Sequence, residues 1–320
     1  MTKRVKWVVA GVCAALVLAG GMILLVCHLR AQRFAAEAQA AAEARAKAEA
    51  RAAAERKALY AQFNIDAPGT RLFVPLSKPG YYPLRAEIGK ALFNDPRLTG
   101  LPTTQTIVCG RCHHLGAGGT DSKVHHGVLT RPVCNVVFGT VYFHDGSASN
   151  LHAAVAKMID DPHFSGHPKF SGGRQLARVV ALLEKDASLV EKFKGAYGDG
   201  LTGTNVVDAV AEFLKTRVTE GTPYDFWCAG HADSFTPEQQ RGSEVFLNAR
   251  CMDCHGVPAL GGRMVSNGRK VPALRGLGLR KAYLTEGKIK DLDVVVPMMS
   301  GGAALAPQDR KSLVEFLKAL

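Results

Sequence analysis

Charged residues are absent from the apolar stretch 7–29, and Lys3, Arg4 and Lys6 stand directly before it. A helix of about 20 apolar residues crosses the hydrocarbon core of a bilayer, and a basic flank favours the cytoplasmic side. The apolar core of a cleaved signal peptide is shorter, about 7–15 residues. We therefore predict a cytoplasmic flank at 1–6 and an uncleaved transmembrane anchor at 7–29.

An Ala-rich segment follows the apolar stretch. Residues 30–63 consist almost entirely of Ala, Glu, Arg and Lys, which favour a helix and pair at i,i+4. No Leu or Ile heptad runs through this segment, which disfavours a strong coiled coil. The pattern predicts a solvated helical stalk, followed by an extended connection at 64–82, where Pro and Gly accumulate.

The remainder of the chain repeats itself and is poor in the alternating pattern of strands. The matched segments are IGKALF at 88–93 with RGSEVF at 241–246, and VAEFLK at 210–215 with LVEFLK at 313–318. The duplication predicts two helical domains of the same topology, at 64–232 and 233–320. The expected fold class is mostly α, with an anchor and a stalk preceding these two domains.

A C-x-x-C-H motif occurs once in each repeat, at 109–113 and at 251–255. In this motif two thiols bind the haem vinyl groups and the next histidine reaches the iron. The predicted haem-binding residues are Cys109, Cys112, Cys251 and Cys254, with His113 and His255 as proximal ligands. A zinc site of the four cysteines is the rival interpretation. Against it stand the 142 positions between the pairs (251 − 109) and the histidine after each. His114 is expected to have a different role, a supporting hydrogen bond or none.

Charge adds little to this interpretation. The 320-residue chain has a formal net charge of +12, but no run of five or more Lys and Arg. A solvated basic surface explains such an even distribution, so we expect no nucleic-acid partner. Bound haem would add carboxylates and lower the net charge.

Four stretches together resemble the bacterial dihaem cytochrome c peroxidase family, from about Arg85 to the C-terminus. They are IGKALFNDPRLTG, CGRCHHLGAGGTD, TPYDFWCAGHA and KVPALRGLGLRKAY. The resemblance implies two cytochrome c-like domains, each with one covalent haem c. The first haem would react with hydrogen peroxide, and the second would be the high-potential point of electron entry. The implied donors are a small cytochrome, a copper protein or the quinol pool.

The resemblance also implies upper ligands for both haems. Met299 takes the place of the axial methionine of the second haem, with the adjacent Met298 as the alternative. His126, before a glycine, takes the place of the removable histidine over the first haem, with His125 in reserve. Met158 matches Met299 in the repeat, but its helical spacing from Leu151, Ala154 and Val155 favours a place in the core.

The chain departs from the family at several positions. His144 replaces the Trp of a Trp-Asp-Gly, and Ala154 replaces a Gln. No Glu occupies the place of the pocket carboxylate. Peroxide cleavage needs a group that moves a proton between the two oxygens. The local substitutes are His163, Asp161 and Asp160.

Four further residues lie near the expected domain junction. Thr130 is near the place of an Asn that helps to hold calcium in relatives, which leaves calcium in doubt. Cys134 and Cys228 form either a disulfide or two separate thiols. Trp227 is expected to lie in the core rather than on an electron path.

The sequence therefore predicts a single-pass protein of the bacterial inner membrane with periplasmic haem domains, and leaves a homodimer open. The predicted reaction converts hydrogen peroxide, two electrons and two protons to two waters, with His126, His163 and Asp161 as catalytic residues. One alternative is a non-enzymatic electron-transfer subunit that kept the scaffold and lost the peroxidase pocket. Another is an oxidase-like dihaem enzyme that modifies a protein side chain.

Overall fold

The computed structural model describes residues 79–99, 107–161, 174–299 and 305–320, together with three single residues. These three, Gln32, Gln39 and Glu43, are helical and exposed. The chain divides into two compact units, Met1–Phe63 and Asn64–Leu320. The predicted anchor at 7–29 and most of the stalk lie outside the described residues. Within the described residues, no helix has the length and apolar character needed to cross a membrane.

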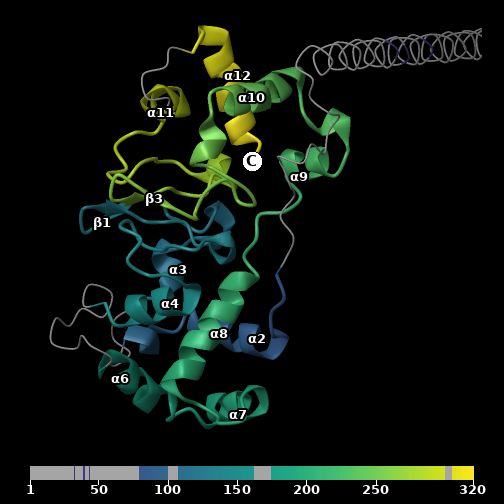
Figure 1. Ribbon diagram of the computed structural model, residues 1–320. Coiled ribbons are helices and arrows are strands. Elements are labelled where there is room, and N and C mark those ends of the chain that lie inside the picture. Colours follow the sequence, from purple (N-terminus) through teal and green to yellow (C-terminus); the bar gives the residue numbers. More distant parts are fainter. Residues whose placement is uncertain are drawn as a thin grey trace, which may run out of the picture. The chain divides into compact units, whose positions relative to one another are not determined.

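The second unit is mostly helical, as predicted (Figure 1). The helices of its first half are α2 (Pro83–Leu92), α3 (Cys109–Cys112), α4 (Leu151–Ile159), α6 (Arg174–Leu183), α7 (Ala187–Ala196) and α8 (Gly203–Lys215). Those of its second half are α9 (Pro223–Cys228), α10 (Pro237–Asn248), α11 (Leu292–Met299) and α12 (Pro307–Lys318). Short 3-10 turns are η1 (Pro96–Thr99), η2 (Leu115–Ala117), η3 (Val136–Phe138), η4 (Ala232–Ser234), η5 (Cys251–Asp253) and η6 (Leu277–Leu279).

The same pair of crossing helices occurs in both halves. Helix α2 crosses α8 at Gly89, where a Cβ would lie 1.8 Å from the carbonyl oxygen of Ala209. Helix α10 crosses α12 at Gly242, where a Cβ would lie 2.0 Å from the carbonyl oxygen of Ser312. Only glycine permits such close backbone contact. The duplicated IGKALF and RGSEVF segments are therefore the equivalent sides of two equivalent helix crossings.

Each half has its own hydrophobic core. In the first half the apolar sides of α2, α4, α6 and α8 meet around Leu92, Val179 and Val206. In the second half α10 and α12 meet around Phe246 and Phe316, whose rings lie 5.5 Å apart. Burial of these side chains supplies the main stabilisation of each half.

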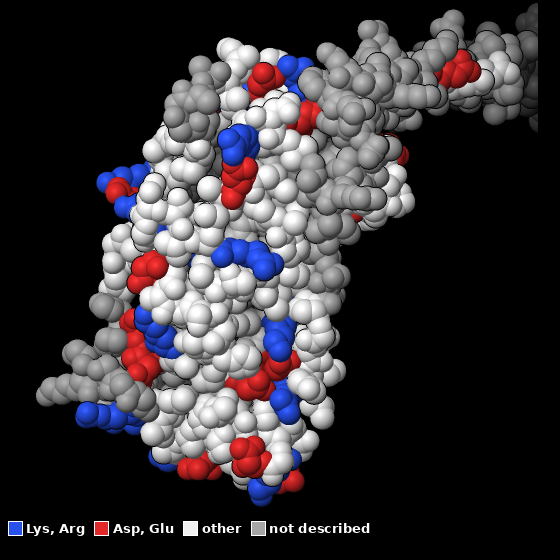
Figure 2. Space-filling view, in the orientation of Figure 1, with Lys and Arg blue, Asp and Glu red and all other residues white. Residues whose placement is uncertain are grey.

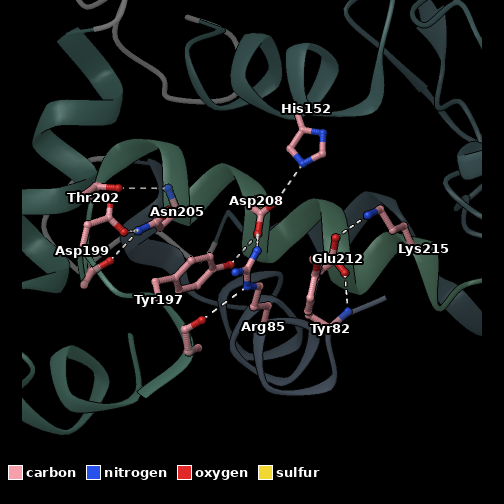
Figure 3. Close-up of polar contacts among 12 residues, drawn as sticks. Tyr82, Arg85, His152, Tyr197, Asp199, Thr202, Asn205, Asp208, Glu212 and Lys215 are labelled. Carbon is pink, nitrogen blue, oxygen red and sulfur yellow. Dashed lines mark hydrogen bonds and ion pairs between the residues drawn. The ribbon is translucent and has the colours of Figure 1, made fainter. Parts of the chain in front are cut away.

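Polar contacts tie α8 to the segments around it (Figure 3). Asp208 of α8 accepts hydrogen bonds from Tyr197 Oη at 2.9 Å, from His152 Nε2 of α4 at 2.9 Å and from Arg85 Nη1 of α2 at 3.3 Å. One carboxylate therefore joins α8 to α2, to α4 and to the end of α7. The side chain of Asp208 is only 19% exposed, whereas that of His152 is 47% exposed, so the network is shielded from water at the carboxylate and open at His152.

Two β-hairpins take part in the contact between the halves. Strands β1 (Val124–His125) and β2 (Val128–Leu129) form one, and β3 (Val265–Ser266) and β4 (Arg269–Lys270) form the other. The first hairpin donates a backbone hydrogen bond from Leu129 N to Thr285 O at 2.8 Å. The second donates one from Lys270 N to His144 O at 2.7 Å. Each hairpin therefore docks on a loop of the other half, and β1 and β3 lie near each other in Figure 1.

The two docking contacts are equivalent by position. Leu129 and Lys270 are 141 residues apart (270 − 129), and so are His144 and Thr285 (285 − 144). Two glycines of the loops are equivalent in the same way, since Gly146 and Gly287 are also 141 residues apart (287 − 146). A Cβ at Gly146 would lie 2.5 Å from Val265, and one at Gly287 would lie 2.9 Å from Val124. The junction is thus an internal two-fold contact in which each copy offers the same surface to the other.

Candidate functional site

Both C-x-x-C-H motifs fold as a single tight turn. In the first, α3 holds Cys109 and Cys112, and the backbone N–H of His113 donates to Cys109 O at 2.9 Å. In the second, η5 begins at Cys251, and the N–H of His255 donates to Cys251 O at 2.8 Å. A turn of this size presents two thiols and an imidazole to one bound group.

The preceding helix positions the first motif. The N–H of Gly110 donates to Phe93 O at 3.3 Å, just beyond the end of α2. A Cβ at Gly110 would lie 2.2 Å from Asn94 Oδ1, so a larger residue here would require the Asn94 side chain to move. In the second half α10 leads into the motif through Arg250, which has a φ of 58°.

The imidazoles of His113 and His255 are oriented in the same way. Nδ1 of His113 donates to Gly119 O at 3.2 Å, and Nδ1 of His255 donates to Leu260 O at 3.3 Å. This bond fixes the tautomer and leaves Nε2 as the lone-pair donor to a metal. Burial lowers the pKa of both imidazoles and favours the neutral, ligating form.

The cysteines of the motifs are free thiols. Burial raises the pKa of Cys109 to about 12 and also raises the pKa of Cys251. Among the described residues, the potential metal ligands that gather within 4.8 Å are Cys112, Asp121 and His125. The two cysteine pairs do not come together into a four-sulfur site. The geometry therefore favours haem attachment over zinc.

The two histidines predicted over the first haem lie in the β1–β2 hairpin. His125 is bound to Asp121, with 2.7 Å between Nε2 and Oδ2. Burial raises the pKa of Asp121, but hydrogen bonds, first that of His125, outweigh it and leave the pKa lowered. His126 and Gly127 occupy the turn with φ of 51° and 82°, and the side chain of His126 is exposed. The structure shows that His125 is engaged by a buried carboxylate, and His126 stays the predicted ligand.

The predicted proton-transfer residues lie at or beyond the end of α4. Asp161 is half-buried just after this helix, and Asp160 Oδ1 accepts from the backbone N of Gln175 at 3.3 Å. His163 lies outside the described residues. Met158, on the same helix, is half-buried and packs against the first core, as its helical spacing predicted.

The predicted methionine ligands of the second haem are not core residues. Met298 is 54% exposed and Met299 is 57% exposed, both at the end of α11. Large apolar side chains are more often buried, so two exposed methionines at one helix end fit a ligand role. Their exposed fractions do not show which of the two is the ligand. Met299 stays the predicted ligand, because the repeat spacing favours it.

Four other residues have structural explanations. His114 is exposed, and its Nε2 donates to Arg111 O at 3.0 Å within the first motif turn. Cys134 and Cys228 are free thiols, so the structure does not contain the disulfide that the sequence left open. Trp227 is 2% exposed and stacks on Phe235 at 4.7 Å, which confirms the expected core position.

One group of residues at the junction was missed by the sequence analysis. Arg131 Nε donates to His144 Nδ1 at 3.0 Å, and Lys270 binds the backbone of His144. Burial and the nearby charge of Arg131 lower the pKa of His144 to about 4, so the imidazole is neutral. The family resemblance led us to expect Trp at this position. In the structure the imidazole of His144 accepts a hydrogen bond from the positively charged Arg131. The sequence does not indicate this contact, because only the fold places His144 between the two hairpins.

These residues fit covalent haem in each half: paired free thiols, a neutral imidazole with Nε2 available, and an exposed methionine in the second half. The motif arrangement defines the chain as a c-type cytochrome. Residues 83–233 match the family model for di-haem cytochrome c peroxidase, and residues 239–320 match that for cytochrome c. The chain belongs to the di-haem cytochrome c peroxidase family, and the expected two cytochrome c-like domains are confirmed.

Individual relatives agree with this assignment. The chain is 31% identical over 277 residues to "Cytochrome c peroxidase Ccp" of Escherichia coli, a match that covers 74% of this chain and 58% of that protein. It is 29% identical over 279 residues to "Cytochrome c551 peroxidase" of Nitrosomonas europaea, covering 73% of this chain and 79% of the relative. The fold resembles the crystal structure of "a MauG-like protein associated with microbial copper homeostasis", with a TM-score of 0.64 and 17% identity over 78% of this chain and 92% of that one.

Proposed function

We propose that this protein is a di-haem peroxidase that reduces hydrogen peroxide to water. The observation that carries the proposal is an asymmetry between two otherwise equivalent halves. Both halves hold the same motif turn and the same oriented histidine. After the first motif in the chain a histidine stands on a hairpin turn, whereas after the second a methionine stands at the end of a helix. A replaceable ligand suits a reaction site, and a thioether suits a high-potential electron-entry site.

The chain's own residues would attach two haem c groups. Cys109 and Cys112 would form the thioethers in the first domain, with His113 as the proximal ligand. Cys251, Cys254 and His255 would do the same in the second. The bound haems supply redox-active iron. The carbonyls that accept from the histidine Nδ1 atoms keep both rings oriented and neutral.

The β1–β2 hairpin would couple the two halves. His126 lies at its turn, and Leu129, three residues further on, is bonded to Thr285 of the second half. A change in the second half can therefore shift the hairpin that carries the removable ligand. In this proposal His126 would occupy the peroxide-binding position of the first domain and would leave it when the hairpin moves.

Proton transfer would fall to the residues that follow α4. Asp161 and His163 would take a proton from one peroxide oxygen and deliver it to the other. Ala154 offers no hydrogen bond to peroxide where relatives were expected to have Gln. General acid–base catalysis raises a reaction rate by about 10²–10⁴-fold. Because this chain has fewer proton-transfer groups than the family resemblance implies for its relatives, we expect slow turnover.

The proposed location is the periplasmic side of the bacterial inner membrane, anchored through 7–29. The proposed electron donors are a small cytochrome, a copper protein or the quinol pool. Basic and acidic side chains alternate on the face drawn in Figure 2, which suits contacts with several kinds of donor.

The test is stopped-flow mixing of the half-reduced, full-length holoprotein with hydrogen peroxide. We expect a reaction at the first haem that requires reduction of the second. His163→Ala should remove most of the rate and leave both haem spectra unchanged. A first haem that stays six-coordinate in every redox state, without reaction above free haem, would replace the enzyme with an electron-transfer relay.

A further inference from the structure

One buried acid of the second domain has no partner. Glu244 lies in α10 and is only 3% exposed, and its Oε1 is buried without a hydrogen-bond partner. No described residue forms an ion pair with Glu244, and the guanidinium of Arg241, three residues earlier, is held by Asp309 at 2.6 Å. The proposed peroxide chemistry does not use this carboxyl group, although burial of an unpaired acid is costly.

A second oxygen without a partner lies one helical turn earlier. Gln240 is 1% exposed, and its Oε1 is also buried and has no hydrogen-bond partner. The amide nitrogen of Gln240 is already used, because Nε2 donates to Ala232 O at 3.3 Å and to Phe235 O at 3.2 Å. Residues four apart are neighbours on a helix, so two acceptor oxygens that lack a donor stand on one face of α10. The protonated form of Glu244 adds an O–H donor to this face, and the ionised form adds none.

Few charges act on the carboxyl group of Glu244. Helix α12 and the turn η5 pack against α10, and Gln240 bonds to the η4 region. The titratable and charged residues of these elements and of α10 are Asp309, Arg310, Lys311, Glu315, Lys318, Cys251, Asp253, Asp233, Glu238 and Arg241. Burial raises the pKa of Glu244 to about 7, and of the residues just named only Arg241 opposes this effect. The protonation of such a carboxyl group responds to one further charge nearby.

Helix α10 joins this carboxyl group to the second haem-attachment turn. Glu244 stands seven residues before Cys251 (251 − 244), and α10 continues to Asn248. At about 1.5 Å per residue the two positions are about 10 Å apart along the helix axis. At about 10 Å and an effective dielectric constant of about 20, a unit charge changes a proton affinity by on the order of tenfold. An electron that enters the second domain adds one such negative charge.

We propose that Glu244 takes up a proton when the second haem accepts an electron. A one-electron donor, such as a small cytochrome or a copper protein, reduces the ferric iron to the ferrous state. A proton from solvent converts the Glu244 carboxylate to the neutral acid. The step therefore consumes one electron and one proton, and the negative charge gained at the iron is offset by the charge lost at Glu244. This step needs haem in the second domain and does not depend on peroxide reduction.

The test is a spectroelectrochemical titration of both haems in the full-length holoprotein from about pH 5 to about pH 9, without peroxide. The potential of the second haem should be highest in acid, where Glu244 is neutral in both redox states. It should fall as the pH rises and become level again where Glu244 is ionised in both states. The expected total fall is on the order of 60 mV, which is the tenfold change in proton affinity converted at 59 mV per tenfold for one electron.

Glu244→Gln should keep the potential of the second haem at its acid value over the whole range, because the amide stays neutral. Glu244→Asp should retain a pH-dependent potential, because it keeps an ionisable group. Glu315→Gln is the matched control on α12, where the Glu315 side chain is 39% exposed and lies 2.9 Å from Lys318 Nζ. This control should show the same dependence on pH as the parent.

Infrared difference spectra between the oxidised and reduced protein follow the proton directly. A band of a protonated carboxyl group should grow when the second haem of the parent is reduced at neutral pH, and Glu244→Gln should lack this band. A parental dependence on pH in haem-loaded Glu244→Gln would overturn the proposal. A parental potential that stays level over the whole range would overturn it as well, as would loss of the dependence in Glu315→Gln.

Peroxide reactivity is measured separately by stopped flow. A protein that shows the expected pH dependence and does not react with peroxide contradicts only the peroxidase function. A level potential in a peroxide-reactive protein contradicts only the role of Glu244.

Discussion

Nε2 of His125 lies 2.7 Å from Oδ2 of Asp121, and the Asp121 side chain is only 3% exposed. A buried carboxylate holds the imidazole at the end of β1, directly before the turn that carries His126. Two adjacent histidines that are hard to tell apart by sequence therefore have different surroundings.

His126→Gly is predicted to give a five-coordinate, peroxide-reactive first haem even in the fully oxidised protein, because it removes the removable ligand. His125→Gln should keep a six-coordinate haem, because it alters only the contact with Asp121. Electron paramagnetic resonance of the oxidised variants distinguishes these outcomes. A five-coordinate haem in His125→Gln and a parental spectrum in His126→Gly would reverse the two roles.

Met299→His is predicted to lower the potential of the second haem by on the order of 0.1 V or more, because imidazole replaces a thioether that stabilises reduced iron. Met158→Leu should leave this potential unchanged, since Met158 packs against the first core. Redox titration of both haems is the measurement. If Met298→Leu lowers the potential and Met299→Leu does not, Met298 is the ligand.

Gly89→Ala is predicted to destabilise the first half by about 1–3 kcal/mol, because the added Cβ would meet the carbonyl oxygen of Ala209 at 1.8 Å. Gly242→Ala should have a similar effect at the second crossing. Gly195→Ala in α7 is the matched control, since nothing lies within 4 Å, and a gain of about 0.4–1 kcal/mol is expected. Urea unfolding followed by far-ultraviolet circular dichroism measures all three, and equal stabilities would contradict the crossing geometry.

Glu244 is buried in α10, its Oε1 has no hydrogen-bond partner, and burial raises its pKa from 4.5 to about 7. An acid with a raised folded-state pKa costs no stability below its unfolded pKa, and the folding stability falls as pH rises from 4.5 to about 7 and then stays level. Glu244→Gln should therefore raise the unfolding free energy at pH 8 by on the order of 1–2 kcal/mol and leave it nearly unchanged at pH 4. Exposed Glu184→Gln should have little effect at either pH, and a pH-independent gain for Glu244→Gln would contradict the assignment.

The sequence was sufficient to predict those elements whose structure depends on residues close together in the chain. The C-x-x-C-H turns, the duplicated helix segments and the core position of Met158 all follow from local spacing, and the structure has them as expected. The junction could not be found in this way. Arg131 and Lys270 look like ordinary surface cations in the sequence, and only the docking of the two hairpins brings them to one place.

The distinction between His125 and His126 has the same origin. Their residue type and position are almost identical, and the difference lies in the burial of Asp121, four residues upstream of His125. Burial is a property of the fold that spacing alone does not provide. His144 was visible as a departure from the family, but its contact with Arg131 was not.

The reciprocal docking of the hairpins restricts how the two copies of this ancestral duplication can evolve. Leu129 reaches Thr285 and Lys270 reaches His144 because hairpin and loop are the same number of residues apart in each copy. A single insertion between them in one copy would break register with a partner that had not changed. The copies are therefore free to exchange a histidine for a methionine and to differ in overall length, but each must keep the same 15-residue spacing between hairpin and loop (144 − 129 and 285 − 270).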